Sequence, residues 1–595
     1  MLLQCRHTRD NNESCLTDKM QKRFLNLFLV LWLLTSLTAL VGMYHLWWTR
    51  EHKLYDSKGI SEQRTEVFKR AGLSQSLLKD AEVIDRTWPR HIRYSAVGDH
   101  NHLSYVKYLL LPRIPAGSDY WVVKENEGRL QASVNFLDQG KGQVHPPKST
   151  GFLMSLLLLL GVAVFLKHFI ENLSLPEGFA AAFLLLTQFT VLSRALSGDA
   201  TFGFWPAAAL GICGWILVAL IIPGCRWDSN FKKIFTGKNF SMGMIGSRAV
   251  WIFLILIVGL SFLWSVLMSV VVVPDDWDAW AIWGAKAKVL ALGLGPLKDV
   301  TYFDHADYPL LWPSLWAFSG WCAGGWEEHW SRAWGPICMI LCAWQTGIVV
   351  RRLTGDPNHG ALMAAVFLSI PMVPLIASWS YAEAPLWLML SCSFGRLLLW
   401  RSEKRDLHLI FAAVFAAAAA FTKNEGLLFF ALCFVWLILS LRMDWRTCLQ
   451  CFTLPFTLLY LPWFVWVRGS LALGSHAVEG FKGGTAEALV RALNRLPEAL
   501  KAIVAMWLDI RQWNLVVWVV LALSLVYLFR SRGHLMNLFI PCMMLLFFFL
   551  INVFHMQEIG LLMSSWNRLT AQTLLLFLMV LGIHYLPAAL GRYSP

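Results

Sequence analysis

Acidic and basic side chains that could carry out chemistry gather at a few points where long apolar stretches end. The densest group begins with Asp275-Asp276-Trp277-Asp278, and Lys286 and Lys288 follow within the next helical segment. A carboxylate at a membrane boundary can remove a proton from a substrate hydroxyl or amine, and neighbouring ammonium groups can bind an anion. The alternative that the sequence leaves open is a solvated acidic cap at the start of a helix.

The same polar loop contains a second group within Tyr302 to Pro309. Asp304, His305 and Asp307 have side chains that can ligate a metal ion or position a substrate. No second His stands at ligand spacing in this segment, so the sequence leaves a metal site open without requiring one. The Tyr308-Pro309 pair favours an extended turn into the next apolar segment, because a residue before proline avoids the helical conformation.

Three further charged groups lie where apolar stretches begin or end. Glu383 opens one stretch, Lys423 and Glu425 stand in the turn Thr422-Lys423-Asn424-Glu425-Gly426, and Arg568 opens the last stretch. Ionisable residues at membrane depth are unfavourable unless they are paired or used, so each is a candidate for a site. Helix-terminal stabilisation and turn formation are the structural alternatives.

Apolar helices must position these groups, and the composition favours many of them. Of the 595 residues, 57% are hydrophobic and only 15% are charged, which excludes an ordinary soluble chain. Stretches of about 18 apolar residues or more can each cross about 30 Å of hydrocarbon, and they predict about fourteen helical spans. These spans are 24–46, 150–168, 177–194, 205–223, 248–273, 331–350, 359–376, 382–400, 406–422, 426–441, 447–468, 513–529, 535–555 and 569–588.

The loops between these spans alternate in charge. Basic residues concentrate in alternate loops, as expected on the cytoplasmic side, and every candidate group above falls in the other set. The sequence therefore predicts cytoplasmic N- and C-termini and a site on the outer face. The net charge of +13 follows from the basic loops, and we expect no nucleic-acid partner. The loops predicted to be cytoplasmic are Arg226 to Arg248, Arg351-Arg352, Arg401 to Arg405, Arg442 to Arg446 and Arg530 to Arg532.

Arg568 is placed by this count on the outer face, where the charge bias disfavours it. This position predicts an anionic partner. Either a substrate anion or a structural ion pair with Glu558 or Glu425 satisfies that prediction.

Two parts of the chain are predicted to lie outside the membrane core. Residues 47–149 have a helical beginning (64–83) and later alternating segments (120–123 and 130–136), which predict a small α/β domain on the outer face. Thr485 to Asp509 has the pattern of an amphipathic helix on the outer leaflet. Trp277, Trp280 and Trp283, three residues apart, predict one stripe on another interfacial helix.

The whole chain is thus predicted to be an all-α polytopic membrane protein with one small α/β domain near the N-terminus. We divide it into a cytoplasmic tail (1–23), a membrane anchor (24–46), the outer domain (47–149), accessory transmembrane helices (150–247) and a core (248–595).

The motifs of this core, in their order, resemble those of the GT-C superfamily of integral membrane glycosyltransferases. Asp276-Trp277-Asp278-Ala279-Trp280 is similar to the modified acidic motif of that family, and Asp307-Tyr308-Pro309-Leu310-Leu311 to a later turn in the same loop. Tyr381-Ala382-Glu383, Thr422 to Gly426 and Trp566-Asn567-Arg568-Leu569 resemble further elements of bacterial members. The likeness is best to the group of protein O-mannosyltransferases and the lipid A aminoarabinose transferase, and covers about residues 248–595.

Two features depart from the family pattern. Four spans and a soluble domain precede the core, whereas the family core normally begins at its first span. Asn567 stands where an acidic residue is expected before Arg568. The first departure bears on the acceptor, and the second on the role of the last motif.

The resemblance implies a polyprenyl-phosphate-linked sugar donor and an inverting transfer to an envelope glycan, lipid or protein, on the outer face of a bacterial inner membrane. In that scheme Asp278 is the general base, and Asp276 or Glu383 orients the acceptor or stabilises charge on the sugar. Some relatives use a divalent cation and others do not. The implied phosphate-binding residues are Arg568, Lys423, Lys286 and Lys288, and the implied acceptor- or loop-positioning residues are Asp304, His305, Asp307, Tyr308 and Glu425.

Two other functions remain compatible with the sequence. A transporter or flippase for a lipid-linked saccharide also needs many spans and charges near a membrane face. A scaffold whose outer domain binds a partner is the third possibility. A transporter should place polar groups at mid-membrane and often shows paired repeats of interrupted helices, and we find no such repeat in the sequence.

Overall fold

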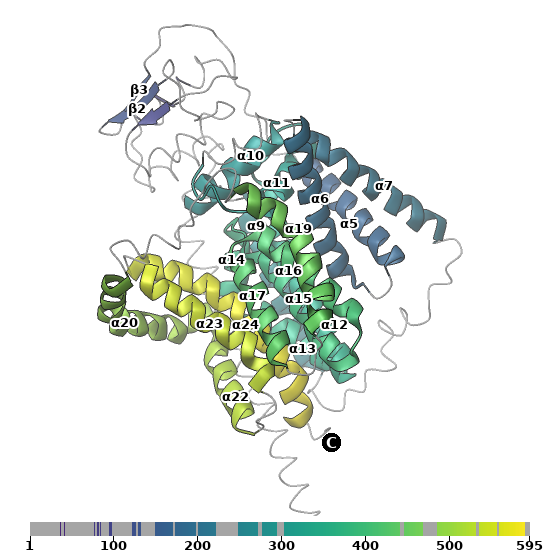
Figure 1. Ribbon diagram of the computed structural model, residues 1–595, viewed down its shortest axis with the longest axis vertical. Coiled ribbons are helices and arrows are strands. Elements are labelled where there is room, and N and C mark those ends of the chain that lie inside the picture. Colours follow the sequence, from purple (N-terminus) through teal and green to yellow (C-terminus); the bar gives the residue numbers. More distant parts are fainter. Residues whose placement is uncertain are drawn as a thin grey trace, which may run out of the picture.

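The computed structural model describes most of the chain from residue 149 onward, and short pieces before it (Figure 1). Helices make up nearly all of the described part after residue 148. The predicted anchor, 24–46, lies outside the described residues except for Ser36, Thr38 and Val41, which are helical. The described residues are 36, 38, 41, 77, 80–81, 84, 95–97, 122–126, 129–132, 149–170, 173–197, 200–221, 248–271, 277–293, 303–440, 445–467, 485–530, 535–555 and 559–589.

Three short strands are described within the predicted outer domain. β1 (Ser95–Val97) pairs in parallel with β2 (Val122–Asn126), and β2 pairs antiparallel with β3 (Arg129–Ala132), in the order β1-β2-β3. Asn126 faces Arg129, so two residues join β2 and β3. β2 and β3 overlap the alternating segments at 120–123 and 130–136, β1 was not predicted, and the small α/β domain is not confirmed. The rest of the predicted domain lies largely outside the described residues.

Seven helices in the described ranges are long and apolar enough to cross a membrane. They fall in α5 (Ser149–Phe169), α6 (Leu175–Ser197), α9 (Arg248–Val271), Trp330–Thr354 with α12 (Trp334–Thr354), Trp445–Val465 with α19 (Leu454–Val465), α23 (Leu535–His555) and α24 (Ile559–Ala589).

An eighth span is possible where α13 (Pro357–Leu368) and α14 (Met372–Ser378) pass the test together with a bend of 66°. Four further apolar helices are shorter, and α15 (Glu383–Glu403) is not among the seven. A helix or helix pair coincides with each predicted span after the first, but the count of fourteen is not confirmed. The shorter apolar segments lie in α7 (Phe204–Ile221), α16 (Asp406–Thr422), α17 (Glu425–Leu439) and α22 (Val516–Arg530).

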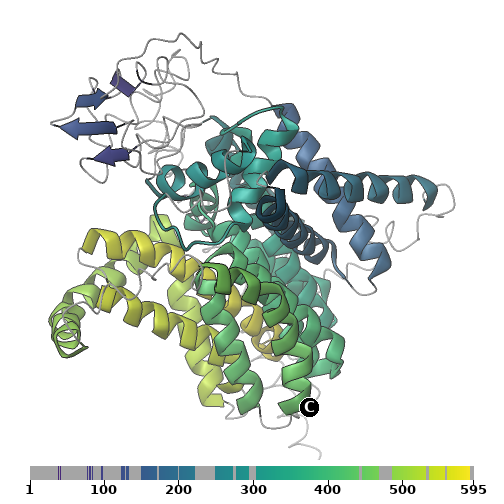
Figure 2. The ribbon, with the colours of Figure 1, turned by 45° about the horizontal axis from the view of Figure 1, so that its top comes forward.

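The core of the bundle is built around α15 and α16, with α12 and α24 against α15 (Figures 1 and 2). From Glu383 to Trp400 every residue of α15 is buried. The buried alanines of α16 let neighbouring helices approach closely, as small residues do in membrane bundles. The outer helix α9, in contrast, exposes Ile252, Ile255 and Leu263, which is the surface expected against lipid.

The accessory helices α5 and α7 pack at backbone distance. A Cβ on Gly214 would lie 1.9 Å from the carbonyl oxygen of Gly161, and a Cβ on Gly211 would lie 2.4 Å from that of Leu158. Glycine is therefore needed at this crossing, and α6 then joins α5 to the core through contacts with α12, α15 and α16.

The predicted interfacial tryptophan stripe is wrong. Ala279–Gly284 forms a π-helical turn, η2, that continues into α10 (Ala285–Ala291), and the chain returns through α11 (Leu311–Cys322). This segment packs into the bundle, so Trp280 and Trp283 are fully buried instead of facing an interface. The π-helical turn also changes the angular spacing of the tryptophans, on which the stripe depended.

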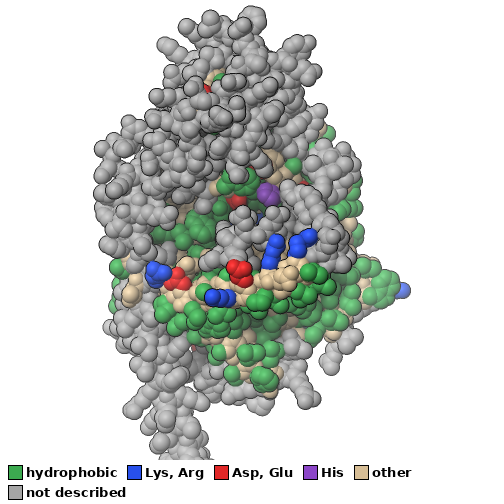
Figure 3. All heavy atoms as spheres, turned by 90° about the vertical axis from the view of Figure 1, so that its left-hand side faces the viewer, with side chains coloured by type: hydrophobic (Ala, Val, Ile, Leu, Met, Phe, Trp, Pro, Cys, Tyr) green, Lys and Arg blue, Asp and Glu red, His purple; other side chains and the backbone are tan. Residues whose placement is uncertain are grey.

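The predicted amphipathic helix at 485–509 is present as α20 (Thr485–Leu508), which contacts α23 and α24. It buries Ile503 and Met506 and exposes Leu489 and Leu493. In Figure 3, Lys, Arg, Asp and Glu side chains lie in a row above a broad apolar surface on this side of the molecule. An exposed apolar strip beneath a charged row is typical of a helix at a membrane surface.

Candidate functional site

Four segments that are distant in sequence bring charged side chains together. Asp278 precedes η2, Glu383 begins α15, Lys423 and Glu425 flank the turn between α16 and α17, and Arg568 lies in α24. We call these five residues the charged cluster. Each of the five had been singled out by the sequence, and the fold makes them neighbours.

The charged cluster is a continuous chain of ion pairs. The Arg568 Nη1 atom lies 2.6 Å from Asp278 Oδ2 and 3.6 Å from Glu383 Oε1. The Lys423 Nζ atom lies 2.8 Å from Glu383 Oε1 and 2.8 Å from Glu425 Oε1. Glu383 is thus the central carboxylate, contacted by both cations.

Burial varies along this chain in an ordered way. The Glu383 side chain is 0% exposed, Lys423 is 7% and Arg568 is 14% exposed. Glu425 and Asp278, at the two ends, are 19% and 25% exposed. A substrate arriving from solvent would therefore meet the two terminal carboxylates before the central one.

The cluster has unused hydrogen-bonding capacity. Glu383 Oε2, Glu425 Oε2 and Arg568 Nε are buried and have no hydrogen-bond partner among the described residues. Buried polar groups are normally satisfied, so these three atoms are available to a ligand. Although burial alone lowers the pKa of Lys423, Glu383 and Glu425 raise it by more, and the group stays charged.

Glu383 is positioned by the turn that precedes α15. Ser380 has a left-handed backbone (φ 70°), a conformation that requires support in a residue other than glycine. Trp312 Nε1 donates to the Ser380 carbonyl oxygen at 2.8 Å, and buried Arg332 Nη1 donates to the Ser380 hydroxyl at 3.3 Å. The turn also places the Tyr381 ring 4.8 Å from the Arg568 guanidinium, a cation–π contact that holds the arginine in place.

Lys423 and Glu425 are positioned by the close approach of α17 to α16. The chain is extended at Lys423, and the Gly426 amide donates to the Lys423 carbonyl at 2.9 Å. A Cβ on Gly426 would lie 2.1 Å from the backbone carbon of Ala419. Glycine at 426 therefore lets the turn close tightly enough for Lys423 to reach both carboxylates.

The loop at 303–310 borders the charged cluster through Asp307. The Asn424 side-chain amide donates to Asp307 Oδ2 at 3.0 Å, which ties this loop to the 422–426 turn. The His305 ring packs on the Tyr308 ring, with centroids 4.6 Å apart, and His305 itself has a left-handed backbone (φ 49°). Burial raises the pKa of the Tyr308 hydroxyl, so it remains a neutral donor at physiological pH. Asp304 and Lys288 are half-buried in the same region.

Lys286 stabilises the backbone of the 303–310 loop. Its fully buried ammonium donates to the carbonyl oxygens of His305 at 2.5 Å and Tyr308 at 3.4 Å. Burial lowers the pKa of Lys286 to about 7, against the opposing influence of Asp307 and Asp304. The structure thus engages Lys286 with backbone carbonyls, whereas the sequence had suggested a phosphate ligand.

Metal binding has no support in the described residues, which contain no group of three or more His, Cys, Asp and Glu side chains able to hold an ion. Asp275 and Asp276 lie outside the described residues, so the predicted role of Asp276 is not placed.

Arg568 is paired, but with acids other than the two expected from the sequence. Its partners are Asp278 and Glu383, whereas Glu425 binds Lys423 and Glu558 lies outside the described residues. Neighbouring Asn567 accepts from Trp513 Nε1 at 3.0 Å and donates to Gln512 Oε1 at 3.3 Å. An ionised aspartate could not make the second bond, because it only accepts. The amide at 567 instead fastens α24 to α21 (Ile510–Trp513).

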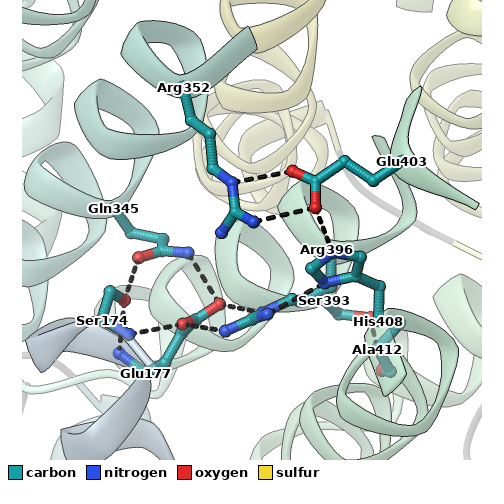
Figure 4. A network of polar contacts seen from close by, with 9 residues as sticks. All are labelled: Ser174, Glu177, Gln345, Arg352, Ser393, Arg396, Glu403, His408 and Ala412. Atoms are coloured by element: carbon teal, nitrogen blue, oxygen red, sulfur yellow. Dashed lines mark hydrogen bonds and ion pairs between the residues drawn. The ribbon is translucent and has the colours of Figure 1, made fainter. Parts of the chain in front are cut away.

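A second polar network, missed in the sequence, lies elsewhere in the bundle (Figure 4). Arg396 of α15 donates from Nε and Nη2 to the two carboxylate oxygens of Glu177 on α6, at 2.5 and 2.6 Å. Ser174 N and Gln345 Nε2 also donate to Glu177. Both oxygens of this buried carboxylate are satisfied, so the network joins helices and offers no free atom to a ligand.

The same network continues to the surface through His408. Arg396 Nη1 lies 3.0 Å from His408 Nδ1, and His408 Nε2 lies 3.0 Å from Glu403 Oε2. Because arginine can only donate, Nδ1 must accept and Nε2 must carry the proton. Glu403 also binds Arg352 through two hydrogen bonds. The signal in the sequence was the Ser174-x-x-Glu177 capping box and an arginine inside an apolar helix.

Comparison with known proteins adds no identification: no family model, curated protein or solved structure matches the chain.

Proposed function

We propose that this protein is a membrane glycosyltransferase that moves a sugar from a polyprenyl-phosphate donor to an envelope acceptor on the outer face of the membrane. The proposal includes about fourteen crossings, cytoplasmic termini and a GT-C-like core at 248–595, in a bacterial inner membrane. The observation that carries it is the charged cluster, in which two cations and three carboxylates from four distant segments meet with three buried polar atoms unsatisfied.

The chemistry of glycosyl transfer needs both kinds of charge. The acceptor oxygen or nitrogen forms a bond to the anomeric carbon while the bond from that carbon to the phosphate oxygen breaks. The phosphate leaves with the electron pair, and the acceptor proton passes to a carboxylate. Asp278, the most exposed acid of the cluster, is the proposed proton acceptor, and Arg568 is the proposed phosphate ligand.

The other cluster residues have supporting roles in this proposal. Glu383, fully buried, stabilises positive charge that develops on the sugar ring and holds both cations in place. Lys423 contributes a point charge to the phosphate, and Glu425 orients the acceptor. Asp307 and Tyr308 shape the adjoining loop, and buried Lys286 keeps that loop in position.

A transporter is the competing function, and the Glu177–Arg396 pair is the feature that bears on it. A transport site in the bundle needs polar groups that can bind cargo. Glu177 uses both carboxylate oxygens within the protein, so this pair serves to join α6 and α15 instead.

Mass spectrometry of envelope glycans and glycolipids from a deletion strain tests the proposal. We expect one sugar to be missing and its lipid-linked donor to accumulate on the outer leaflet. Wild-type protein should restore the sugar, and an Asp278→Asn variant expressed at the same level should not. Accumulation of the lipid-linked precursor on the inner leaflet would contradict the proposal and indicate transport.

A further inference from the structure

The proposed base and the proposed phosphate ligand are bound to each other. Arg568 Nη1 donates to Asp278 Oδ2 at 2.6 Å, which is the short distance of a charge-assisted hydrogen bond. While this bond lasts, Asp278 Oδ2 accepts a hydrogen bond from Arg568 and is not available to a substrate proton. The two groups that the proposed reaction needs are thus paired with each other.

We propose that the donor phosphate displaces Asp278 from Arg568, so that the general base is released only when the lipid-linked donor is bound. This inference rests on the proposed function and adds its regulation. A phosphate oxygen takes the place of Asp278 Oδ2 at Arg568 Nη1, and the freed carboxylate turns toward the acceptor. Without donor, the base stays occupied, and water or a stray hydroxyl is not activated.

Arg568 is suited to exchange one anion for another. Its guanidinium has five N–H groups, and Nε is buried without a hydrogen-bond partner among the described residues. Nη1 is thus available to a phosphate oxygen once Asp278 leaves, and the Nε–H, on the other edge of the guanidinium, is a separate unused donor. The Tyr381 ring on one face and Glu383 Oε1, 3.6 Å from Nη1, keep the arginine in place during the exchange.

Asp278 is suited to leave. It precedes η2 but makes no capping hydrogen bond from its side chain to the helix. It is also the most exposed carboxylate of the charged cluster, so water can hydrate the carboxylate when it leaves Arg568. The ion pairs of Lys423 are less suited to such an exchange, because Lys423 is buried between two carboxylates and one of them, Glu383, is fully buried.

Displacement predicts that removing the proposed general base should tighten phosphate binding. Purified protein in detergent is titrated with a polyprenyl monophosphate and, separately, with the uncharged polyprenol of the same length. The dissociation constant of the polyprenol divided by that of the polyprenyl monophosphate isolates the contribution of the phosphate, and this ratio rises when the phosphate binds more tightly. A charge-assisted hydrogen bond is worth about 1.5–3 kcal/mol, so Asp278→Asn should raise this ratio by about tenfold or more. Asp278→Ala, which removes the acceptor oxygen completely, should do the same and serves if Asp278→Asn fails to fold.

Asp307→Asn is the matched control. It removes one negative charge from the same region, but the Asp307 side chain is bonded to Asn424. Asp307→Asn should raise this ratio only slightly, because it removes one negative charge that repels the phosphate from a distance. Arg568→Gln should abolish the preference for phosphate over alcohol.

The outcomes separate the two proposals. Displacement is supported if the ratio of dissociation constants rises in both Asp278 variants clearly more than it does in Asp307→Asn. If wild type prefers the phosphate but the Asp278 variants rise no more than Asp307→Asn, displacement is overturned and the proposed donor class stands. If neither wild type nor any variant prefers phosphate over alcohol, both proposals are overturned.

Discussion

Glu177 and Arg396, 219 residues apart in the sequence, form a buried ion pair with two hydrogen bonds of 2.5 and 2.6 Å. The pair joins an accessory helix, α6, to the central helix of the core, α15. One partner lies in the predicted accessory region and the other in the predicted core, so this buried pair joins the two regions.

Glu177→Gln should strongly destabilise the protein. It removes the charge that compensates buried Arg396, and breaking a buried pair from one side costs about 3–5 kcal/mol. The measurement is the free energy of unfolding in mixed detergent and denaturant. Arg352→Gln is the control, because its ion pair with Glu403 is half-exposed and should be worth about 1 kcal/mol or less.

A double variant distinguishes charge from packing. In Glu177→Leu/Arg396→Met both charges are gone, so the double variant should be more stable than Glu177→Gln alone. Equal losses in Glu177→Gln and Arg352→Gln would contradict the importance of this pair.

Asp278→Asn should reduce turnover by about 10²–10⁴, the usual range for general-base assistance. The measurement is the release of polyprenyl phosphate from the sugar donor by purified protein, with folding checked by size-exclusion chromatography. Together with the tighter phosphate binding proposed above, a lower kcat without a higher donor KM is expected. Near-normal turnover would move the base to Glu425, the other exposed carboxylate of the cluster, and Glu425→Gln would then show the loss.

Lys286 should make stability depend on pH near neutrality. Its pKa is about 7 in the folded protein and about 10.5 when exposed, so the unfolded chain binds more protons between these values. Stability should therefore rise with pH from about 7 to about 10, by at most about 1.4 kcal/mol per pH unit. The thermal midpoint of wild type should increase over this range more than that of Lys286→Met. Lys288→Met, on the same helix, should keep the wild-type slope, and identical slopes in all three proteins would refute the assignment.

Gly426→Ala should disturb the charged cluster through the backbone. The added Cβ would lie 2.1 Å from a backbone atom of Ala419, so α16 and α17 must separate. Such overpacking typically costs about 1–3 kcal/mol, and the displaced turn should also weaken phosphate binding. Gly259→Ala in α9 is the control, because nothing lies within 4 Å of its Cβ position. That change should leave stability unchanged or increase it by up to about 1 kcal/mol.

Sidedness can be tested with single cysteines in a cysteine-depleted background. Leu292→Cys, on an exposed residue after α10, should react with an impermeant thiol reagent from outside intact cells. Ser402→Cys, exposed near the other end of α15, should react only after the inner membrane is opened. The reverse pattern would place the charged cluster in the cytoplasm and rule out an outer-face transferase.

The sequence by itself singled out every residue of the charged cluster, among other candidates. A charged side chain at the end of an apolar stretch is visible in one dimension, since long hydrophobic runs and their polar interruptions are local properties. For the same reason most helices after residue 148 and the amphipathic α20 could be predicted, but α24 begins ten residues before the predicted span and 359–376 is divided into α13 and α14.

Only the tertiary structure decided which charges meet. Arg568 and Asp278 are 290 residues apart, and their contact depends on where the fold places α24 relative to the residue before η2. Nothing local in the sequence distinguishes Asp278 from Glu558 as the partner. The burial of Trp280 and Trp283 was likewise decided by the return of the chain through α11, which removed the tryptophans from the predicted interface. Ion pairs and burial depend on distances between segments, and those distances are fixed only when the helices pack together.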